Sequence, residues 1–175
     1  MLAEHLTRLF NDCWQQAKLP EDWKRGVVVK IPKNWDTTEC SNWRGITLLS
    51  IPGKVFRMIL LRVLRSAVDE RLREEQAGFR SNRSCCEQIF SLRNTIEQCI
   101  EYPHPLCVNF VDFQKAFDSI HRELLWAILR IYGILQPFVD VFRSLYLKSS
   151  CCVKTDNGHT AFVEITTGHL FTDFV

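Results

Sequence analysis

The residues best suited to catalysis lie in the stretch FVDFQKAFDSI, at positions 110–120. The run LCVNFVDF at 106–113 predicts a mostly buried strand that delivers Asp112 near its end, and a second acid, Asp118, follows six residues later. Hard cations such as Mg²⁺ take oxygen ligands, and a strand end can fix one carboxylate while the carbonyl of Phe113 supplies a second oxygen. The same aspartate also suits a helix cap or an ion pair, so residue types alone leave these uses open.

Basic residues are concentrated in the middle of the chain. Residues 54–100 carry more Lys and Arg than Asp and Glu, and most of these cations are arginines, whereas residues 101–175 carry more acids than bases. A guanidinium group binds two phosphate oxygens at once, so the segment suits a nucleic acid. Because a solvated helix face has the same composition, the charge pattern permits nucleic-acid binding without requiring it.

The composition of the 175 residues is that of a folded domain. Hydrophobic residues make up 46% and charged residues 24%, which excludes disorder as the main state. No stretch approaches the roughly 18–20 consecutive apolar residues of a membrane span. The N-terminus lacks the charged start and unbroken apolar block of a secretory signal, so we expect an intracellular protein, without distinguishing nucleus from cytoplasm.

Eight cysteines occur in the chain, and none of them forms a CxxC pair. Two adjacent cysteines cannot easily face one metal ion, and an intracellular location offers no oxidising compartment for disulfides. The sequence therefore favours reduced, mostly buried thiols over a zinc site.

Hydrophobic spacing and turn residues predict a mixture of helices and strands. Ser84 and Glu87 predict a capping box at the start of one helix, and Asn157 with Gly158 predicts the turn of a hairpin. The predicted helices span 2–17, 54–73, 84–99, about 121–132 and about 137–147, and the predicted strands span 26–31, 45–50 and 106–113, followed by a hairpin within 151–165. This order indicates an α+β fold with an antiparallel sheet packed with helices.

Four blocks of the sequence resemble, in the same order, the reverse transcriptase domain of non-LTR (LINE-type) retrotransposons. The blocks are LPEDWKRGVVVKIPK, NWRGITLLSIPGKVF, EEQAGFRSNRS and VDFQKAFDSIHRELLW, within residues 19–165. The resemblance covers the N-terminal part of that domain and implies the fingers and partial palm of a right-hand polymerase, with a fingers-like part at 1–100 and a partial palm at 101–175. It also implies an RNA-directed DNA polymerase, a nucleotidyltransferase whose partners are an RNA template, a DNA primer and deoxynucleoside triphosphates.

The resemblance also implies a metal and a sugar contact. In family members the acid at the position of Asp112 is the first of three metal-binding aspartates, and the carbonyl at the position of Phe113 faces a magnesium ion as well. Phe117 matches the bulky residue that lies under the incoming sugar and excludes a ribose 2′ hydroxyl. Mg²⁺ is therefore the implied cofactor, and deoxynucleotides are the implied substrates.

Two further groups of residues match family contacts with phosphates. Lys33 and Arg44 match two cations that bind the incoming triphosphate, although either could be a solvated loop cation. Four residues of AGFRSNR match a loop next to the template strand: Gly78, Phe79, Arg80 and Arg83. The last of these could equally serve the cap of the following helix.

Two tryptophans have competing interpretations. Trp43, beside Arg44, suits either stacking on a base or a structural role within a hairpin. Trp126 has helical spacing with apolar neighbours, which favours core packing.

The sequence departs from the family pattern in its last residues. A glutamine-glycine motif close to GVRQGxxLSP and a later pair of adjacent aspartates are absent from these 175 residues, which read HLFTDFV after Gly168. One of the three expected metal-binding carboxylates is therefore present, and Asp118 does not replace a missing one. We expect an inactive reverse transcriptase fragment; the alternatives are a non-catalytic module that binds RNA or DNA and a degenerate retroelement remnant.

Overall fold

The computed structural model describes residues 1–33, 35–113, 116 and 119–166. The chain forms two compact units: unit 1 contains Met1–Ser66 and Lys115–Val175, and unit 2 contains Ala67–Gln114. No helix within the described ranges is long and apolar enough to span a membrane.

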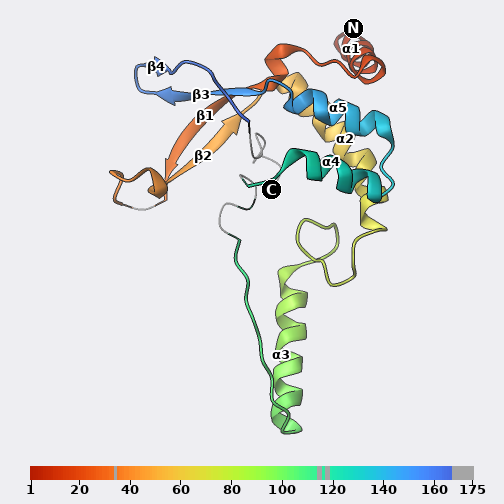
Figure 1. Ribbon diagram of the computed structural model, residues 1–175, viewed down its shortest axis with the longest axis vertical. Coiled ribbons are helices and arrows are strands. Elements are labelled where there is room, and N and C mark those ends of the chain that lie inside the picture. The colour runs from red at the N-terminus through yellow and green to blue at the C-terminus, as the bar shows by residue number, and fades with distance from the viewer. Residues whose placement is uncertain (34, 114–115, 117–118, 167–175) are drawn as a thin grey trace. The chain divides into compact units, whose positions relative to one another are not determined.

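The strands of unit 1 form one mixed sheet (Figure 1). They are β1 (Arg25–Pro32), β2 (Trp43–Leu48), β3 (Ser150–Thr155), β4 (Gly158–His159) and β5 (Val163–Glu164). β1 pairs antiparallel with β2 and parallel with β3, and β4 and β5 both pair antiparallel with β3. The predicted antiparallel sheet is therefore wrong at the β1–β3 contact. Each hairpin alone would leave the N–H and C=O groups of one strand edge unpaired, and the two hairpins satisfy one another by this parallel pairing.

The helices agree with the predicted ones to within a few residues at each end. They are α1 (Leu2–Gln16), α2 (Ile51–Asp69), α3 (Cys85–Glu101), α4 (Arg122–Ile131) and α5 (Gln136–Tyr146), with short 3₁₀ turns η1 (Glu21–Lys24) and η2 (Cys40–Asn42). α2 begins three residues before the predicted start because Pro52 is compatible with the first helical turn. The C-cap residue of α1, Ala17, adopts a left-handed conformation with φ 46°.

Aromatic side chains join the helices of unit 1. The rings of Phe10, Trp23 and Phe56 lie 5.4–5.9 Å apart and connect α1, η1 and α2. Trp126 of α4 is 3% exposed and packs edge-on against Tyr146 of α5, which confirms the predicted core role of Trp126. In Figure 1, α2, α4 and α5 lie close together in the helical part of unit 1. The helices therefore form one core beside the sheet.

Unit 2 departs most from the sequence prediction. Residues 106–113 form no strand and are exposed throughout, with Phe110 at 84% exposure, so the predicted buried strand is wrong. An apolar run needs a neighbouring strand to satisfy its backbone groups, and no described strand pairs with this segment. α3 contains no buried residue, and its N-cap residue Ser84 makes no side-chain cap hydrogen bond, so the predicted capping box is not formed.

The cysteines are free, but their predicted burial is wrong for most of them. Cys13 and Cys152 are buried, whereas four of the eight are exposed: Cys40, Cys85, Cys86 and Cys107. The exposed thiols lie on elements that bury little surface: the hairpin tip, the first turn of α3 and the segment after it. Burial therefore follows the element that carries each cysteine rather than the residue type.

A buried arginine connects three elements of unit 1. Arg57 of α2 is 5% exposed, and its guanidinium donates a hydrogen bond to the carbonyl of Trp23. Burial lowers the pKa of Arg57 to about 10, while the nearby Tyr146 of α5 acts in the opposite direction. The side chain thus brings a charge into the core and ties α2 to η1 beside α5.

The first testable prediction concerns this arginine. Arg57→Ala should reduce the free energy of unfolding by about 2–3 kcal/mol, because it leaves the Trp23 carbonyl without this donor and removes packed side-chain atoms. Urea denaturation followed by circular dichroism measures the change. Arg62→Ala, an exposed arginine of the same helix, should change stability by less than about 0.5 kcal/mol. Equal effects of the two substitutions would contradict the structural role of Arg57.

Candidate nucleotide and nucleic-acid interface

The register of the β1–β2 hairpin determines which side chains share a face. Ile31 pairs with Arg44, and the backbone N–H of Lys33 donates to the carbonyl of Asn42 at 2.7 Å, which continues the same register by one residue. Side chains alternate along each strand, so Lys33 and Arg44 lie on one face as diagonal neighbours, with Cα atoms about 7–8 Å apart. Both residues are exposed. The hairpin therefore brings together the two cations that the sequence singled out.

Contacts on the opposite face of the hairpin hold Trp43 in place. Its indole N–H donates to the carbonyl of Thr37 at 3.1 Å, and the ammonium group of Lys30 lies 5.2 Å from the centre of its ring. Lys30 pairs with Gly45, where an added Cβ would lie 2.8 Å from a methyl carbon of Val28. Of the two interpretations of Trp43, these contacts favour the structural one over base stacking.

Hydrogen bonds centred on Asp36 order the tip of the hairpin. Its carboxylate accepts from the backbone N–H of Thr38 at 3.0 Å and from the hydroxyl of Thr38 at 2.6 Å, and its backbone carbonyl accepts from the side chain of Asn42 at 2.9 Å. The Thr38 hydroxyl and N–H lower the pKa of Asp36. Because the folded pKa is depressed, this contribution is present above the ordinary aspartate pKa and is lost as the pH falls through the lowered value.

The loop of unit 2 that resembles a template-binding loop uses Arg80 internally. Its guanidinium donates to the Asp69 carboxylate at 2.7 Å, the Arg73 carbonyl at 2.7 Å and the Gln76 carbonyl at 3.2 Å, and it is 9% exposed. The hydrogen bond to Asp69 raises the pKa of Arg80 further. This side chain therefore organises the loop, and no periodic pattern in the sequence points to its partner Asp69, eleven residues earlier.

The other residues of this loop face solvent. Phe79 is 67% exposed and has a left-handed backbone with φ 60°, and Gly78 and Arg83 are exposed as well. An ordered loop with an outward aromatic and an outward cation is compatible with a nucleic-acid contact.

The described residues do not assemble the metal site that the resemblance implies. Asp112 and Phe113 are exposed and lie in the segment that forms no strand. Across the described ranges, no group of three His, Cys, Asp or Glu side chains is arranged to hold a metal ion. Hard cations need several oxygen ligands, so Asp112 alone does not fit a magnesium centre. Phe117 and Asp118 lie outside the described residues.

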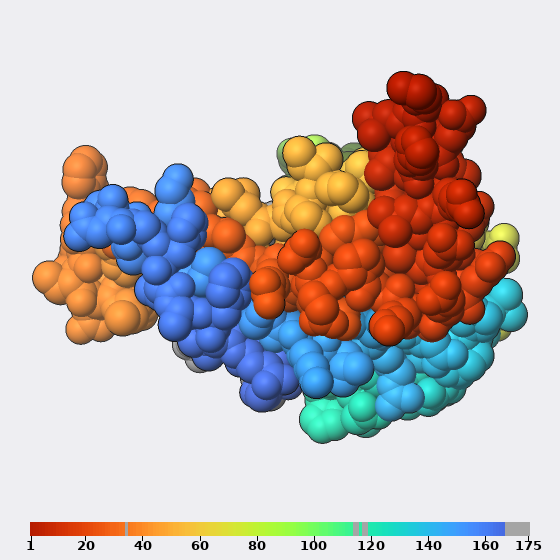
Figure 2. Space-filling model, turned by 90° about the horizontal axis from the view of Figure 1, so that it is seen from above, coloured from red at the N-terminus to blue at the C-terminus, as the bar shows by residue number. Residues whose placement is uncertain are grey.

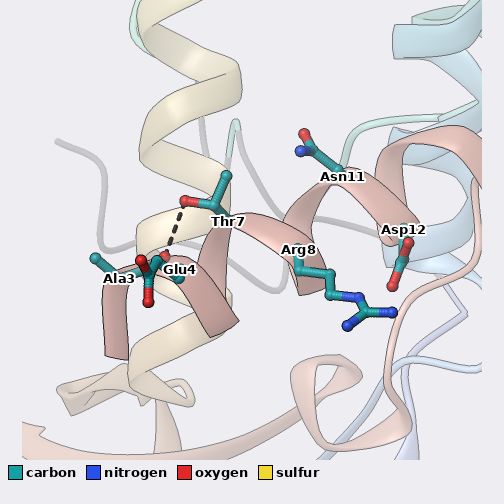
Figure 3. Close-up of a pocket in the computed structure, with 6 residues that line it drawn as sticks. All are labelled: Ala3, Glu4, Thr7, Arg8, Asn11 and Asp12. Atoms are coloured by element: carbon teal, nitrogen blue, oxygen red, sulfur yellow. Dashed lines mark hydrogen bonds between the residues drawn. The ribbon is translucent and has the colours of Figure 1, made fainter. Parts of the chain in front are cut away.

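One hollow on the surface of unit 1 contains none of the predicted site residues. It has a volume of about 570 Å³ and is lined by residues of α1: Ala3, Glu4, Thr7, Arg8, Asn11 and Asp12. Figure 3 shows these side chains along a single helix, with the Thr7 hydroxyl donating to the Ala3 carbonyl at 2.9 Å. Ligand pockets usually combine groups from several elements, so this open hollow is not a candidate active site.

Comparison with known proteins identifies the family to which this chain belongs. Residues 31–169 match the family described as reverse transcriptase (RNA-dependent DNA polymerase). Since the match covers more than half of the chain, the chain belongs to the reverse transcriptase family.

Its relatives are proteins of non-LTR retrotransposons, which confirms the resemblance seen in the sequence. The chain is 30% identical over 171 residues to a 115 kDa protein in the type-1 retrotransposable element R1DM of Drosophila melanogaster, covering 95% of this chain and 16% of that protein. It is 25% identical over 160 residues to a 149 kDa protein of transposon TX1 from Xenopus laevis, covering 91% and 12%. A Pol polyprotein from the type-2 element R2DM of Drosophila melanogaster is 24% identical, covering 81% and 13%. The chain thus spans a small part of the length of these relatives.

The second prediction tests whether Arg80 orders the loop of unit 2, in contrast to the exposed Arg83. Arg80→Ala should make amide hydrogen exchange in residues 70–84 roughly tenfold faster, because the loop loses charge-assisted hydrogen bonds to Asp69 and to two carbonyls. Hydrogen–deuterium exchange with mass spectrometry measures this difference. Arg83→Ala, in the same loop but exposed, should leave the exchange unchanged. If both variants keep wild-type protection, Arg80 does not order the loop.

Proposed function

We propose that this chain is the fingers region and part of the palm of a non-LTR reverse transcriptase, and that it binds an RNA template, a DNA primer and deoxynucleoside triphosphates. The fingers-like part corresponds to residues 1–100 and the partial palm to 101–175. The family match over residues 31–169 supports this assignment, as does the similarity to proteins of the R1DM, TX1 and R2DM elements.

The observation that carries the proposal is the shared face of Lys33 and Arg44. A triphosphate presents several negative charges, and two neighbouring cations on a rigid strand pair can bind them with little loss of side-chain and backbone freedom. The hairpin supplies this arrangement through its register alone. We therefore assign these two residues to the phosphate groups of a nucleotide or of a nucleic-acid strand.

The remaining residues have proposed roles of different kinds. Gly78, Phe79 and Arg83 would face the template strand, and Arg80 would hold their loop in shape. Asp112 and the carbonyl of Phe113 remain the metal-facing groups, and Phe117 the sugar-facing group, that the family implies. The metal-facing pair needs further carboxylates that the described residues do not provide.

This incomplete metal site favours a second candidate function for the 175 residues by themselves. A module that binds RNA or DNA without catalysis requires the cations and the ordered loops, and it requires no magnesium centre. A degenerate remnant with no selected activity would retain neither binding nor catalysis. Binding and catalysis therefore need separate tests.

The third prediction tests nucleic-acid binding. The affinity of the chain for an oligonucleotide should fall steeply with salt in a filter-binding series, and Lys33→Ala/Arg44→Ala should reduce the slope of log K against log salt by about 1 for each cation removed. Arg8→Ala/Lys18→Ala removes the same charge from exposed positions elsewhere in unit 1 and should leave the slope unchanged. A flat salt response of the wild-type chain would favour the remnant and refute the binding proposal.

The fourth prediction tests catalysis. In a primer-extension assay with a poly(rA) template, an oligo(dT) primer and Mg²⁺, the chain should incorporate no more thymidine nucleotide than Asp112→Ala. The reason is that these 175 residues carry one of the three metal-binding aspartates of the family pattern. Incorporation above the Asp112→Ala background would show that other acids complete the site.

A further inference from the structure

The ammonium group of Lys33 makes a hydrogen bond with the tip of the β1–β2 hairpin. Its Nζ donates to the backbone carbonyl of Ser41 at 3.3 Å, and the backbone N–H of Lys33 donates to the carbonyl of Asn42 at 2.7 Å. A lysine ammonium has three hydrogens to donate, so the bond to Ser41 leaves two for phosphate oxygens. The position of the Ser41 carbonyl therefore determines where Lys33 presents its charge.

Contacts within the hairpin order this tip. In Figures 1 and 2 the hairpin, drawn in orange, extends away from the helices of unit 1. Ser41 lies in the 3₁₀ turn η2, where the backbone N–H of Asn42 donates to the carbonyl of Glu39 at 3.1 Å. The side chain of Asn42 donates across the tip to the carbonyl of Asp36 at 2.9 Å. Asn42 thus connects the turn that contains Ser41 to the other side of the tip.

The side of the tip that Asn42 contacts is itself ordered by hydrogen bonds. The carboxylate of Asp36 accepts from the backbone N–H and the hydroxyl of Thr38, and the carbonyl of Thr37 accepts from the indole N–H of Trp43. The Asp36 carbonyl is therefore a fixed acceptor, and the bond from Asn42 transmits this order to η2.

The charge of the tip does not by itself favour phosphate binding by Lys33. Asp36 and Glu39 lie at the same tip, and their carboxylates accept from the hydroxyl groups of Thr38 and Ser41. Two acids beside one lysine give the tip no excess of positive charge. A lysine side chain loses rotamer freedom when it binds a ligand, and an ammonium that is already held in place loses less. The contribution of Lys33 therefore depends on its position.

We propose that Asn42 is a positioning residue for phosphate binding by Lys33: it holds the Ser41 carbonyl in place, and this carbonyl orients the Lys33 ammonium. The inference rests on the proposed function, because it requires that Lys33 contacts a phosphate. Arg44 pairs with Ile31 within the ladder, so its position does not depend on the tip. The effect of Asn42 should therefore reach Lys33 and not Arg44.

The experiment measures the affinity of the full 175-residue chain for a fluorescein-labelled thymidine oligonucleotide at low salt, by fluorescence anisotropy. Asn42→Ala should weaken binding by roughly 2- to 5-fold, and Lys33→Ala by at least as much. Asn42→Ala/Lys33→Ala should bind no more weakly than Lys33→Ala alone, whereas Asn42→Ala/Arg44→Ala should show the product of the two single losses. A general weakening of the hairpin would add to the effect of both cation substitutions.

Two further variants serve as controls. Ser41→Ala keeps the backbone carbonyl that Lys33 contacts and should bind as the wild type does. Trp43→Phe keeps an aromatic ring beside Lys30 but loses the hydrogen bond to Thr37, and it should show the same selective coupling with Lys33. Thermal unfolding curves of all variants should match that of the wild type, and Trp43→Phe provides the same test if Asn42→Ala unfolds.

The outcomes distinguish this inference from the function on which it rests. If Lys33→Ala binds as the wild type does, the phosphate contact of Lys33 is wrong and the positioning role is wrong with it. If Lys33→Ala weakens binding but Asn42→Ala does not, only the positioning role is overturned. The same holds if Asn42→Ala adds to Lys33→Ala as fully as it adds to Arg44→Ala.

Discussion

The parallel pairing of β1 with β3 is the contact on which the architecture of unit 1 depends. It joins residues 25–28 to residues 150–153, so that segments at opposite ends of the sequence share one ladder. A parallel pair requires a crossover connection, and here this connection contains α2, unit 2, α4 and α5. β3 pairs with residues 25–28 of β1 and β2 pairs with residues 27–32, so Val27 and Val28 are paired on both edges. The distal half of the β1–β2 hairpin therefore extends beyond the pairing with β3.

The helical part of unit 1 contains a buried charged side chain, that of Arg57. Arg57 is buried beside Tyr146, whose ring also has the Arg122 guanidinium 5.0 Å from its centre. Burial lowers the pKa of Arg57 to about 10 and raises the pKa of Tyr146. These shifts act oppositely on stability: as the pH rises past about 10, folding gains from the release of the Arg57 proton and loses because the folded state holds the Tyr146 proton. At neutral pH the cost of the buried charge is offset by the hydrogen bond to Trp23 and by aromatic packing.

Local patterns in the sequence predicted the helices and the strands of the β1–β2 hairpin. The predictions failed where the structure depends on pairing between distant segments. The helices and the β1–β2 hairpin follow from apolar spacing and turn residues, which act over a few positions. The β1–β3 contact carries no such signal, because any β-branched run can pair with any other. The run at 106–113 has the composition of a buried strand, yet whether it becomes one depends on a partner edge that its own residues do not specify.

In the candidate site, too, some residues are positioned by local structure and others by contacts with distant residues. The family resemblance singled out Lys33 and Arg44, and the hairpin register, which is a local property, places them on one face. Arg80 has the residue type of a phosphate ligand, but its distant partner Asp69 gives it a structural use that residue type cannot reveal. The two tryptophans of the hairpin likewise differ in exposure. The alternation of side chains along the strands places Trp43 against Lys30, whereas Trp35 lies beyond the last paired residues. Hence the register of the hairpin determines which side chains share a face: Lys33 and Arg44 lie on one face, and Trp43 and Lys30, whose contact stabilises the strands, lie on the other.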